Sequence, residues 1–438
     1  MPKPPSQAQL SEGTKTFSAT KKMPSDSEDF MWGVSVSSYQ YENPDVRKGE
    51  ADYFETDWDY FVEEGKAPRK GNALDSWTHF DKDLAALKKI GAKFYRFNVS
   101  WARVEPRPGV FNETAIRGYV RMARQLKEAG IEPIVCLWHF TFPGWLYDKK
   151  NPVRSNWLHP EVQEYWEGYL DKIIPAMAPY TKYFAPQNEP NGQITTAYLV
   201  GQWPPGILLS TKRYWQAIEA STTMYNEAAR KVHELVPGGK VIAIVALPWW
   251  ERSVLDVTGY FYRSLLHTNY DHLDRVVAST DMIGINYYYS QVVGVFAYAT
   301  LNSRRGNHYS MMGWRINPDG LYKQIQTISA RYGKPMLITE NGVATRKDEK
   351  RIEYMNSHLK AIARALRDGY DVRGYLTWSL ADNYEWHYGY DATFGLSHME
   401  PETLDRKLKL SAYWYRDIME KYSSRAAFKK FGSGAKAH

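Results

Sequence analysis

Eight apolar segments with β-strand character alternate with amphipathic helical segments along most of this 438-residue chain. The expected strands cover residues 30–37, 94–100, 131–137, 183–186, 240–247, 281–288, 335–339 and 372–380. The expected helices cover residues 80–90, 117–129, 160–177, 211–235, 320–332, 351–367 and 411–422. Strands that alternate with helices predict a parallel sheet, and eight such units predict its closure into a (β/α)8 TIM barrel.

The expected barrel occupies residues 29–422 as a single domain, because neither a linker nor a change in composition divides it. Residues 1–28 are polar and rich in Pro, Ser and Lys, which predicts a disordered N-terminal tail. Residues 423–438 carry four of the seven net positive charges and no acidic residue. We expect this segment to be a flexible, solvated basic tail rather than a membrane anchor.

Composition narrows the possible partners and the cellular compartment. The rest of the chain is nearly balanced in charge, which gives no indication of nucleic-acid binding. The single cysteine, Cys136, lies in an apolar run, so we expect a buried thiol. A chain with one cysteine forms no internal disulfide, so the expected compartment is reducing or redox-indifferent. Residues 1–28 lack an apolar signal core, and no segment of the sequence is apolar enough to span a bilayer. A cytoplasmic location is therefore expected, while the oligomeric state cannot be predicted.

Two glutamates follow expected barrel strands in short polar motifs. Glu189 lies in Gln187-Asn188-Glu189-Pro190 after the fourth strand, and Glu340 precedes Asn341-Gly342 at the end of the seventh. Either motif alone is more typical of an ordinary loop. In a parallel barrel both carboxyl groups would point into one opening, as required to break a glycosidic bond with one proton donor and one nucleophile or base.

Other polar and aromatic side chains are expected at the same end of the barrel. They are Gln40, Arg96, His139, Asn286, Tyr288, Trp378 and Glu385. Taken singly, an arginine in a strand favours an internal ion pair, and a lone histidine or tyrosine there favours packing. Their convergence at the carboxyl ends of the strands instead predicts a pocket for a hydrophilic ligand.

Longer motifs resemble glycoside hydrolase family one, the retaining β-glucosidases and β-galactosidases. The resemblance extends from about residue 30 to 415 and includes Asn188-Glu189-Pro190-Asn191, Thr339-Glu340-Asn341-Gly342 and the string Trp-Ser-Leu-Ala-Asp-Asn-Tyr-Glu-Trp at 378–386. The chain resembles a short, divergent member, with Pro186 and Gln187 at positions where the family usually has other residues.

The resemblance implies a role for each of the catalytic candidates. Glu340 is the implied nucleophile and Glu189 the implied general acid/base. Arg96 and Tyr288 are implied to keep Glu340 ionised, and Asn188 to bind the sugar 2-hydroxyl.

The same resemblance implies a sugar pocket that needs neither a metal nor a cofactor. Gln40, His139, Glu385 and Trp386 would bind hydroxyl groups, while Trp378 would stack under the sugar. Trp314 would form the wall of the aglycone site, and Asn286 would support the site from behind. Relatives that act on 6-phosphorylated sugars replace the acid at the position of Glu385, so an unphosphorylated hexose is expected.

The sequence thus predicts a retaining exo-β-glycosidase that releases glucose or galactose from a small β-glycoside. A transglycosylase would use the same intermediate but transfer the sugar to a sugar or lipid hydroxyl. A non-catalytic carbohydrate-binding barrel is disfavoured because both glutamates are present, and an endo-glucanase because the 378–386 string is intact. The sequence does not rank gluco, galacto, fuco and manno substrates or identify the aglycone.

Overall fold

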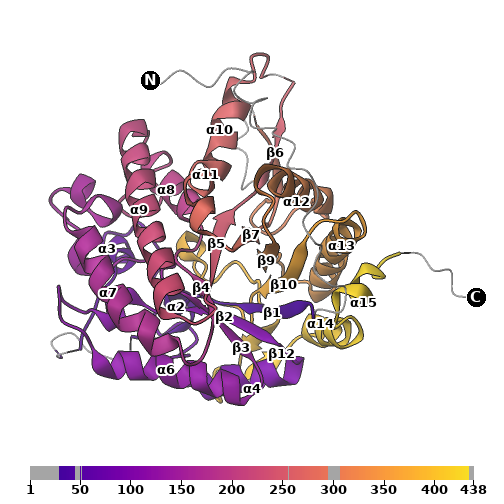
Figure 1. Cartoon of the computed structure of the whole chain (residues 1–438), viewed down its shortest axis with the longest axis horizontal. Coiled ribbons are helices and arrows are strands. Elements are labelled where there is room, and N and C mark those ends of the chain that lie inside the picture. Colours follow the sequence, from indigo (N-terminus) through magenta and orange to yellow (C-terminus); the bar gives the residue numbers. More distant parts are fainter. Residues whose placement is uncertain (1–28, 45–49, 51, 255, 294–305, 434–438) are drawn as a thin grey trace, which may run out of the picture.

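The computed structural model describes residues 29–44, 50, 52–254, 256–293 and 306–433. Eight parallel strands close into a barrel in the order β1-β10-β9-β7-β5-β4-β3-β2, surrounded by helices (Figure 1). The barrel strands are β1 (Met31–Ser35), β2 (Phe94–Asn98), β3 (Glu132–Cys136), β4 (Tyr183–Ala185), β5 (Lys240–Ala246), β7 (Met282–Asn286), β9 (Met336–Asn341) and β10 (Val372–Trp378). All eight lie at the positions expected from the sequence, and the predicted (β/α)8 barrel is confirmed.

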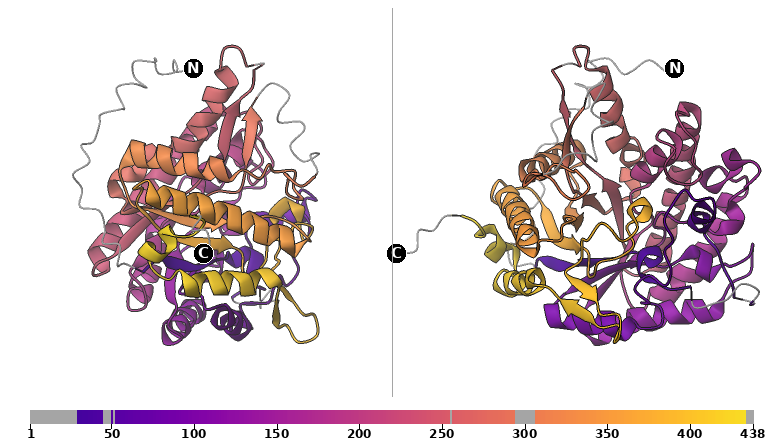
Figure 2. Two further views of the ribbon diagram at one scale, coloured as in Figure 1. Left: turned by 90° about the vertical axis from the view of Figure 1, so that its right-hand side faces the viewer. Right: turned by 180° about the vertical axis from the view of Figure 1, so that it is seen from behind.

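The seven expected helices are also present, with small changes at their ends. They are α4 (Phe80–Ile90), α6 (Glu113–Glu128), α7 (Val162–Met177), α9 (Thr211–Leu235), α12 (Pro318–Tyr332), α13 (Asp348–Arg367) and α14 (Leu410–Lys421). Helix α6 begins earlier than expected because Asn112 caps it, accepting a hydrogen bond from the Ala115 amide. Figure 2 shows α12, α13 and α14, orange to yellow, stacked along one side of the barrel.

Shorter elements complete the described part of the chain. The helices are α2 (Ser38–Tyr41), α3 (Asp57–Glu63), α5 (Trp101–Val104), α8 (Pro190–Tyr198), α10 (Tyr260–Tyr270), α11 (Leu273–Val276) and α15 (Arg425–Lys429). The strands are β6 (Trp249–Arg252) and β8 (Ser290–Val293), which pair in parallel, and β11 (Ser397–Met399) and β12 (Arg406–Leu408), which pair antiparallel. Strand β6 and helix α10 form the projection at the top of Figure 1. The sequence analysis predicted neither this strand pair nor the two helices α10 and α11.

The apolar core has an inner and an outer layer because both faces of a barrel strand are covered. Ile134 and Cys136 of β3 point into the barrel interior, whereas Val135 between them packs in the outer layer. A strand buried on both faces reads as a continuous apolar run, which explains why the strands were visible in the sequence. Cys136 is a buried free thiol, as expected. None of the helices in the described residues has the length and apolar character needed to cross a membrane.

The end of the chain is packed against the barrel, and the expectation of a flexible tail from residue 423 was wrong for residues 423–433. Phe428 of α15 is buried, with its ring centroid 4.6 Å from that of Phe30 and 4.9 Å from that of Trp32. Arg425 is buried too and lies 3.2 Å from a carboxylate oxygen of Asp371. The basic residues suggested solvation, but the aromatic residues between them cover the first barrel strand. Residues 1–28 and 434–438 lie outside the described residues.

Replacing Phe428 with alanine therefore tests whether this segment stabilises the fold. Because a fully buried ring would be lost, Phe428→Ala should lower the free energy of unfolding by about 3–5 kcal/mol, measured by urea denaturation. The control Lys430→Ala, at an exposed neighbouring position, should change it by no more than about 0.5 kcal/mol. Equally small changes in the free energy of unfolding for both variants would show that packing of this segment does not stabilise the fold.

Candidate active site

One cavity of about 230 Å³ opens at the carboxyl ends of the barrel strands and collects most of the predicted site residues. Ten of the twelve line it: Gln40, His139, Glu189, Asn286, Tyr288, Trp314, Glu340, Trp378, Glu385 and Trp386. The remaining two, Arg96 and Asn188, are buried beside it and are joined to lining residues by hydrogen bonds. The closed barrel therefore brings all twelve together from strands and following segments that are far apart in the sequence.

Arg96 forms the base of the site. Its side chain is completely buried, and its Nη1 donates to Oε1 of Glu340 at 2.6 Å. Its Nη2 donates to Oδ1 of Asn188 at 2.5 Å. A buried guanidinium must be paired to offset its desolvation, so Arg96 fixes the positions of both neighbours.

Tyr288 holds the second oxygen of Glu340. Its hydroxyl donates to Oε2 of Glu340 at 2.5 Å. Burial, with the nearby charge of Glu340, raises the pKa of Tyr288 well above its ordinary value, so the phenol keeps its proton and remains a donor. Each carboxylate oxygen of Glu340 thus accepts a hydrogen bond from a buried donor.

Glu189 has a different environment, although it lines the same cavity. Its backbone has φ of 46°, a left-handed conformation that is costly for glutamate and that directs the chain into α8 through Pro190. Asn286 donates to its Oε1 at 2.6 Å, and Thr339 in turn donates to Oδ1 of Asn286. Burial and the negative charge of Glu340 raise the pKa of Glu189 to about 8. Glu189 is therefore mostly protonated at neutral pH.

Glu385 is a third buried carboxyl group in the cavity. Burial and the charge of Glu340 raise its pKa to about 8 as well, against the opposing effect of hydrogen bonds from Gln40 and Trp378. Nε2 of Gln40 donates to Oε2 of Glu385 at 3.2 Å. A neutral Glu385 can both donate and accept, which suits the recognition of a hydroxyl group.

His139 is held as a neutral ring. Its Nδ1 lies 3.3 Å from Nη2 of Arg96, and its Nε2 lies 3.2 Å from Nδ2 of Asn188. Both neighbours carry hydrogen-bond donors, so an added proton would find no acceptor there. Burial, together with the charge of Arg96, lowers the pKa of His139 well below its ordinary value.

Aromatic rings cover much of the remaining cavity wall. The ring of His139 stacks near Trp378 and Trp386, with centroid distances of 6.0 and 6.3 Å. Trp314 stacks on Tyr289 with the centroids 4.8 Å apart, farther along the same cavity. Such faces suit the C–H surface of a sugar or an aromatic aglycone.

Several lining residues were not identified from the sequence. Phe140 and Trp203 pack on Trp386, at centroid distances of 5.3 and 5.8 Å, and Trp250 and Asn269 come from the unpredicted β6–α10 region. Phe140 and Trp386 also have positive φ values of 64° and 49°. Phe140 could have been predicted as a lining residue because it directly follows His139. No local sequence signal distinguishes Trp203 or Trp250 from tryptophans of the core.

The described lining of the cavity contains neither lysine nor arginine, and Arg96 beneath it is already engaged. Elsewhere in the described residues, no group of three or more His, Cys, Asp and Glu side chains is arranged to hold a metal ion. The cavity lining supplies carboxyl groups, imidazoles, hydroxyls, amides and aromatic rings.

Comparison with known proteins agrees with this geometry. The model of the family described as glycosyl hydrolase family 1 matches residues 21–257 and 261–423. The chain belongs to glycosyl hydrolase family 1. This membership confirms the family and the class of enzyme that the sequence predicted.

The alignments with similar proteins extend over almost the whole of this chain. Beta-glucosidase A of Acetivibrio thermocellus is 28% identical over 90% of this chain and 97% of its own. A 6-phospho-beta-galactosidase of Staphylococcus epidermidis is 26% identical over 92% of this chain and 99% of its own. The solved structure of a beta-glycosidase from Pyrococcus horikoshii is 28% identical, with a TM-score of 0.80, and covers 94% of this chain and 99% of that one.

The raised pKa of Glu189 predicts a pH-dependent stability difference. The folded protein binds the proton of Glu189 more tightly than the unfolded chain does, so this proton stabilises the fold. Its contribution to the free energy of unfolding is complete below the ordinary pKa of 4.5 and is lost as the pH rises through about 8. Glu189→Gln keeps a neutral group at every pH. Its free energy of unfolding relative to wild type should therefore increase between pH 5 and pH 9 by more than about 1 kcal/mol.

The control for this measurement is Glu402→Gln, at an exposed turn position. The difference in the free energy of unfolding between Glu402→Gln and wild type should be the same at pH 5 and at pH 9. A constant difference for Glu189→Gln as well would contradict a raised pKa at Glu189.

Proposed function

We propose that this enzyme is a retaining exo-β-glycosidase that hydrolyses the terminal β-linked glucose or galactose of a small glycoside by double displacement. Its assignment as a β-glycosidase agrees with its family and its relatives. The observation that carries the mechanism is the unequal environment of two glutamates in one cavity. Glu340 is paired with Arg96, whereas Glu189 has a pKa raised to about 8.

In the first displacement, a carboxylate oxygen of Glu340 attacks the anomeric carbon. The bond from that carbon to the aglycone oxygen breaks as Glu189 gives its proton to the departing oxygen. Glu189 is suited to this step because it holds a proton at neutral pH. The product is a glycosyl ester of Glu340 and a free alcohol or phenol.

In the second displacement, water attacks the anomeric carbon and the ester bond to Glu340 breaks. Formation of the ester removes the negative charge of Glu340, which is one of the two main causes of the raised pKa of Glu189. The pKa of Glu189 therefore falls in the intermediate, and the ionised group can accept the proton of the attacking water. Two inversions leave the sugar with its original β configuration.

The other residues bind the sugar and orient the reacting groups. Asn188 has its Oδ1 occupied by Arg96 and Asn286, so its Nδ2 would bind the 2-hydroxyl. Gln40, His139, Glu385 and Trp386 would bind the other hydroxyls, with Trp378 under the ring. Trp314 would form the wall on the aglycone side. Asn286 supports Glu189 directly.

An unphosphorylated sugar is favoured by the charges of the cavity. A 6-phosphate would require a cation, yet no lysine or arginine occurs among the described residues that line the pocket. Glu385 would also be driven further from its ionised form by an adjacent phosphate dianion.

Hydrolysis remains the preferred outcome, since the matching relatives do not favour the transglycosylase alternative. We further propose a reducing, cytoplasmic environment, consistent with the single buried thiol of Cys136.

Two variants test the roles of the glutamates with an aryl β-glucoside as substrate. Glu340→Gln should lower kcat by about 10⁴-fold or more because the nucleophile is lost. Glu189→Ala should lower turnover by about 10²- to 10⁴-fold, and added azide should restore part of it by attacking the glycosyl ester from the vacated side. The recovered product should be a β-glycosyl azide, identified by NMR.

Glu402→Gln is the control, since it removes an exposed carboxylate away from the cavity. It should retain wild-type kcat and show no effect of azide. An α-glycosyl azide from Glu189→Ala, or wild-type activity in either cavity variant, would reverse or remove the proposed roles.

A panel of nitrophenyl glycosides tests the substrate class. The β-glucoside or β-galactoside should be hydrolysed, and its 6-phosphate should have a kcat/KM at least about 100-fold lower because no pocket cation compensates the charge. Glu385→Lys provides a cation and should therefore reduce the difference in kcat/KM between the unphosphorylated and the 6-phosphorylated substrate. A 6-phosphate preferred by the wild-type enzyme would contradict the substrate class while leaving the roles of Glu189 and Glu340 intact.

A further inference from the structure

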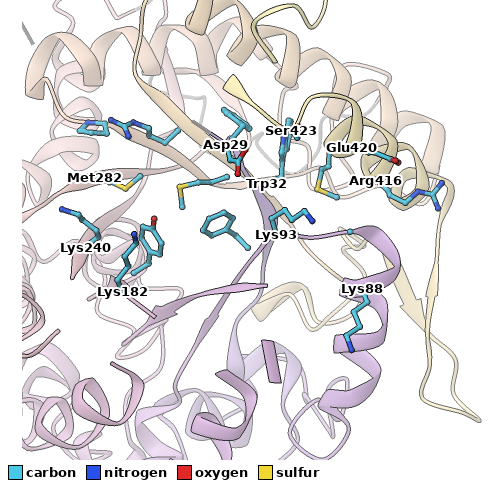
Figure 3. A pocket seen from close by; sticks show the side chains of 18 of the residues that line it. Asp29, Trp32, Lys88, Lys93, Lys182, Lys240, Met282, Arg416, Glu420 and Ser423 are labelled. Carbon is cyan, nitrogen blue, oxygen red and sulfur yellow. The ribbon is translucent and has the colours of Figure 1, made fainter. Parts of the chain in front are cut away.

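A second, larger cavity lies at the opposite end of the barrel from the active site. Its volume is about 960 Å³, and its lining includes residues at the amino ends of β1, β2, β4, β5, β7 and β10 (Figure 3). In barrels of this fold, that end normally contributes stability rather than catalysis. A volume of this size is at the upper end of the range for small-molecule sites. The cavity therefore has room for a ligand independent of the glycoside.

The lining of this cavity is strongly basic. Seven of its side chains are lysine or arginine, whereas three are aspartate or glutamate. Three lysines lie around this end of the barrel: Lys93 precedes β2, Lys182 precedes β4 and Lys240 begins β5 (Figure 3). Lys88 and Lys89 at the end of α4 and Arg416 on α14 extend the positive region to one side.

Carboxylates already pair some of these cations, but not all of them. Lys240 lies 3.5 Å from Asp281, and Arg416 lies 2.8 Å from Asp417. Within the described residues, Lys93 and Lys182 have no carboxylate within ion-pairing distance. Lys182 instead lies over the ring of Tyr183, 5.3 Å from its centroid. Two unpaired lysines beside an excess of positive charge provide an attractive field for an anion.

The floor of the cavity is apolar because it is the lowest layer of the barrel core. Met31 and Met282 belong to that core, and Phe94 and Tyr183 pack against it from below. The rings of Phe94 and Tyr183 are half-buried and meet edge to face, with their centroids 6.0 Å apart. Half-buried aromatic rings next to lysines suit a ligand with a flat or apolar part attached to a charged part.

We propose that this cavity binds an organic polyphosphate, with its phosphate groups near Lys93 and Lys182 and its organic part on the Phe94–Tyr183 floor. Phosphate groups are matched by the cluster of lysines, which act as point charges without a fixed geometry. The organic part would cover surface that the fold leaves half-exposed. This site is separate from the glycosidase site and does not depend on the proposed function.

Binding of ATP, inorganic triphosphate and adenosine to the full-length enzyme, measured by calorimetry without divalent cations, tests the proposal. ATP should bind with a Kd below about 1 mM at low salt, more tightly than triphosphate and much more tightly than adenosine. The double variant Lys93→Glu/Lys182→Glu should raise the Kd for ATP at least about tenfold. Added salt should weaken ATP binding to wild type, because the attraction involves exposed charges.

The matched control is Lys150→Glu/Lys212→Glu, which reverses two exposed lysines outside this cavity. It should bind ATP as wild type does, and both double variants should keep wild-type glycosidase activity and thermal stability. Absence of ATP binding, or equal binding by wild type and the cavity variant, would overturn the site. Equal affinities for ATP and triphosphate would overturn the role of the apolar floor.

Discussion

A single buried guanidinium organises the active site. Arg96 lies inside the barrel with its side chain inaccessible to solvent, and it donates to Glu340 from one nitrogen and to Asn188 from the other. Leaving such a charge unpaired in the interior would cost several kcal/mol, so the pairing with these partners stabilises the barrel. Strand β2 is thereby linked to β9 and to the end of β4. The position of the proposed nucleophile follows from the need to neutralise this cation.

Three carboxyl groups line the cavity above Arg96, and only Glu340 accepts a hydrogen bond from that cation. Glu340 accepts from Arg96 and Tyr288, whereas Glu189 and Glu385 are buried near its charge and have pKa values raised to about 8. Identical side chains therefore have different surroundings within one cavity. Because Glu340 contributes to both raised values, its chemical state would be communicated to the other two groups without movement of the backbone.

The two ends of the barrel have opposite electrostatic character. The carboxyl end presents buried acids, amides and aromatic rings, and no lysine or arginine in its described lining. The amino end presents a basic opening above the lowest layer of the barrel core. One cylinder of strands thus separates a site suited to a neutral sugar from one suited to an anion.

The sequence alone determined the eight barrel strands and the seven main helices, because strands buried on both faces and amphipathic helices leave long local patterns. It also predicted twelve candidate site residues, some from their places at strand ends and others, such as Trp314, from the family resemblance. Tertiary structure alone decided that Asn286 meets Glu189 and that Phe428 meets Trp32, whereas the family resemblance already implied that Arg96 meets Glu340. These contacts join residues that are 97 positions apart for Asn286–Glu189 and 396 positions apart for Trp32–Phe428, so no local pattern encodes them. The β6–β8 pair and the packed C-terminal segment escaped prediction for the same reason, since their short segments are stabilised by distant partners rather than by their own propensities.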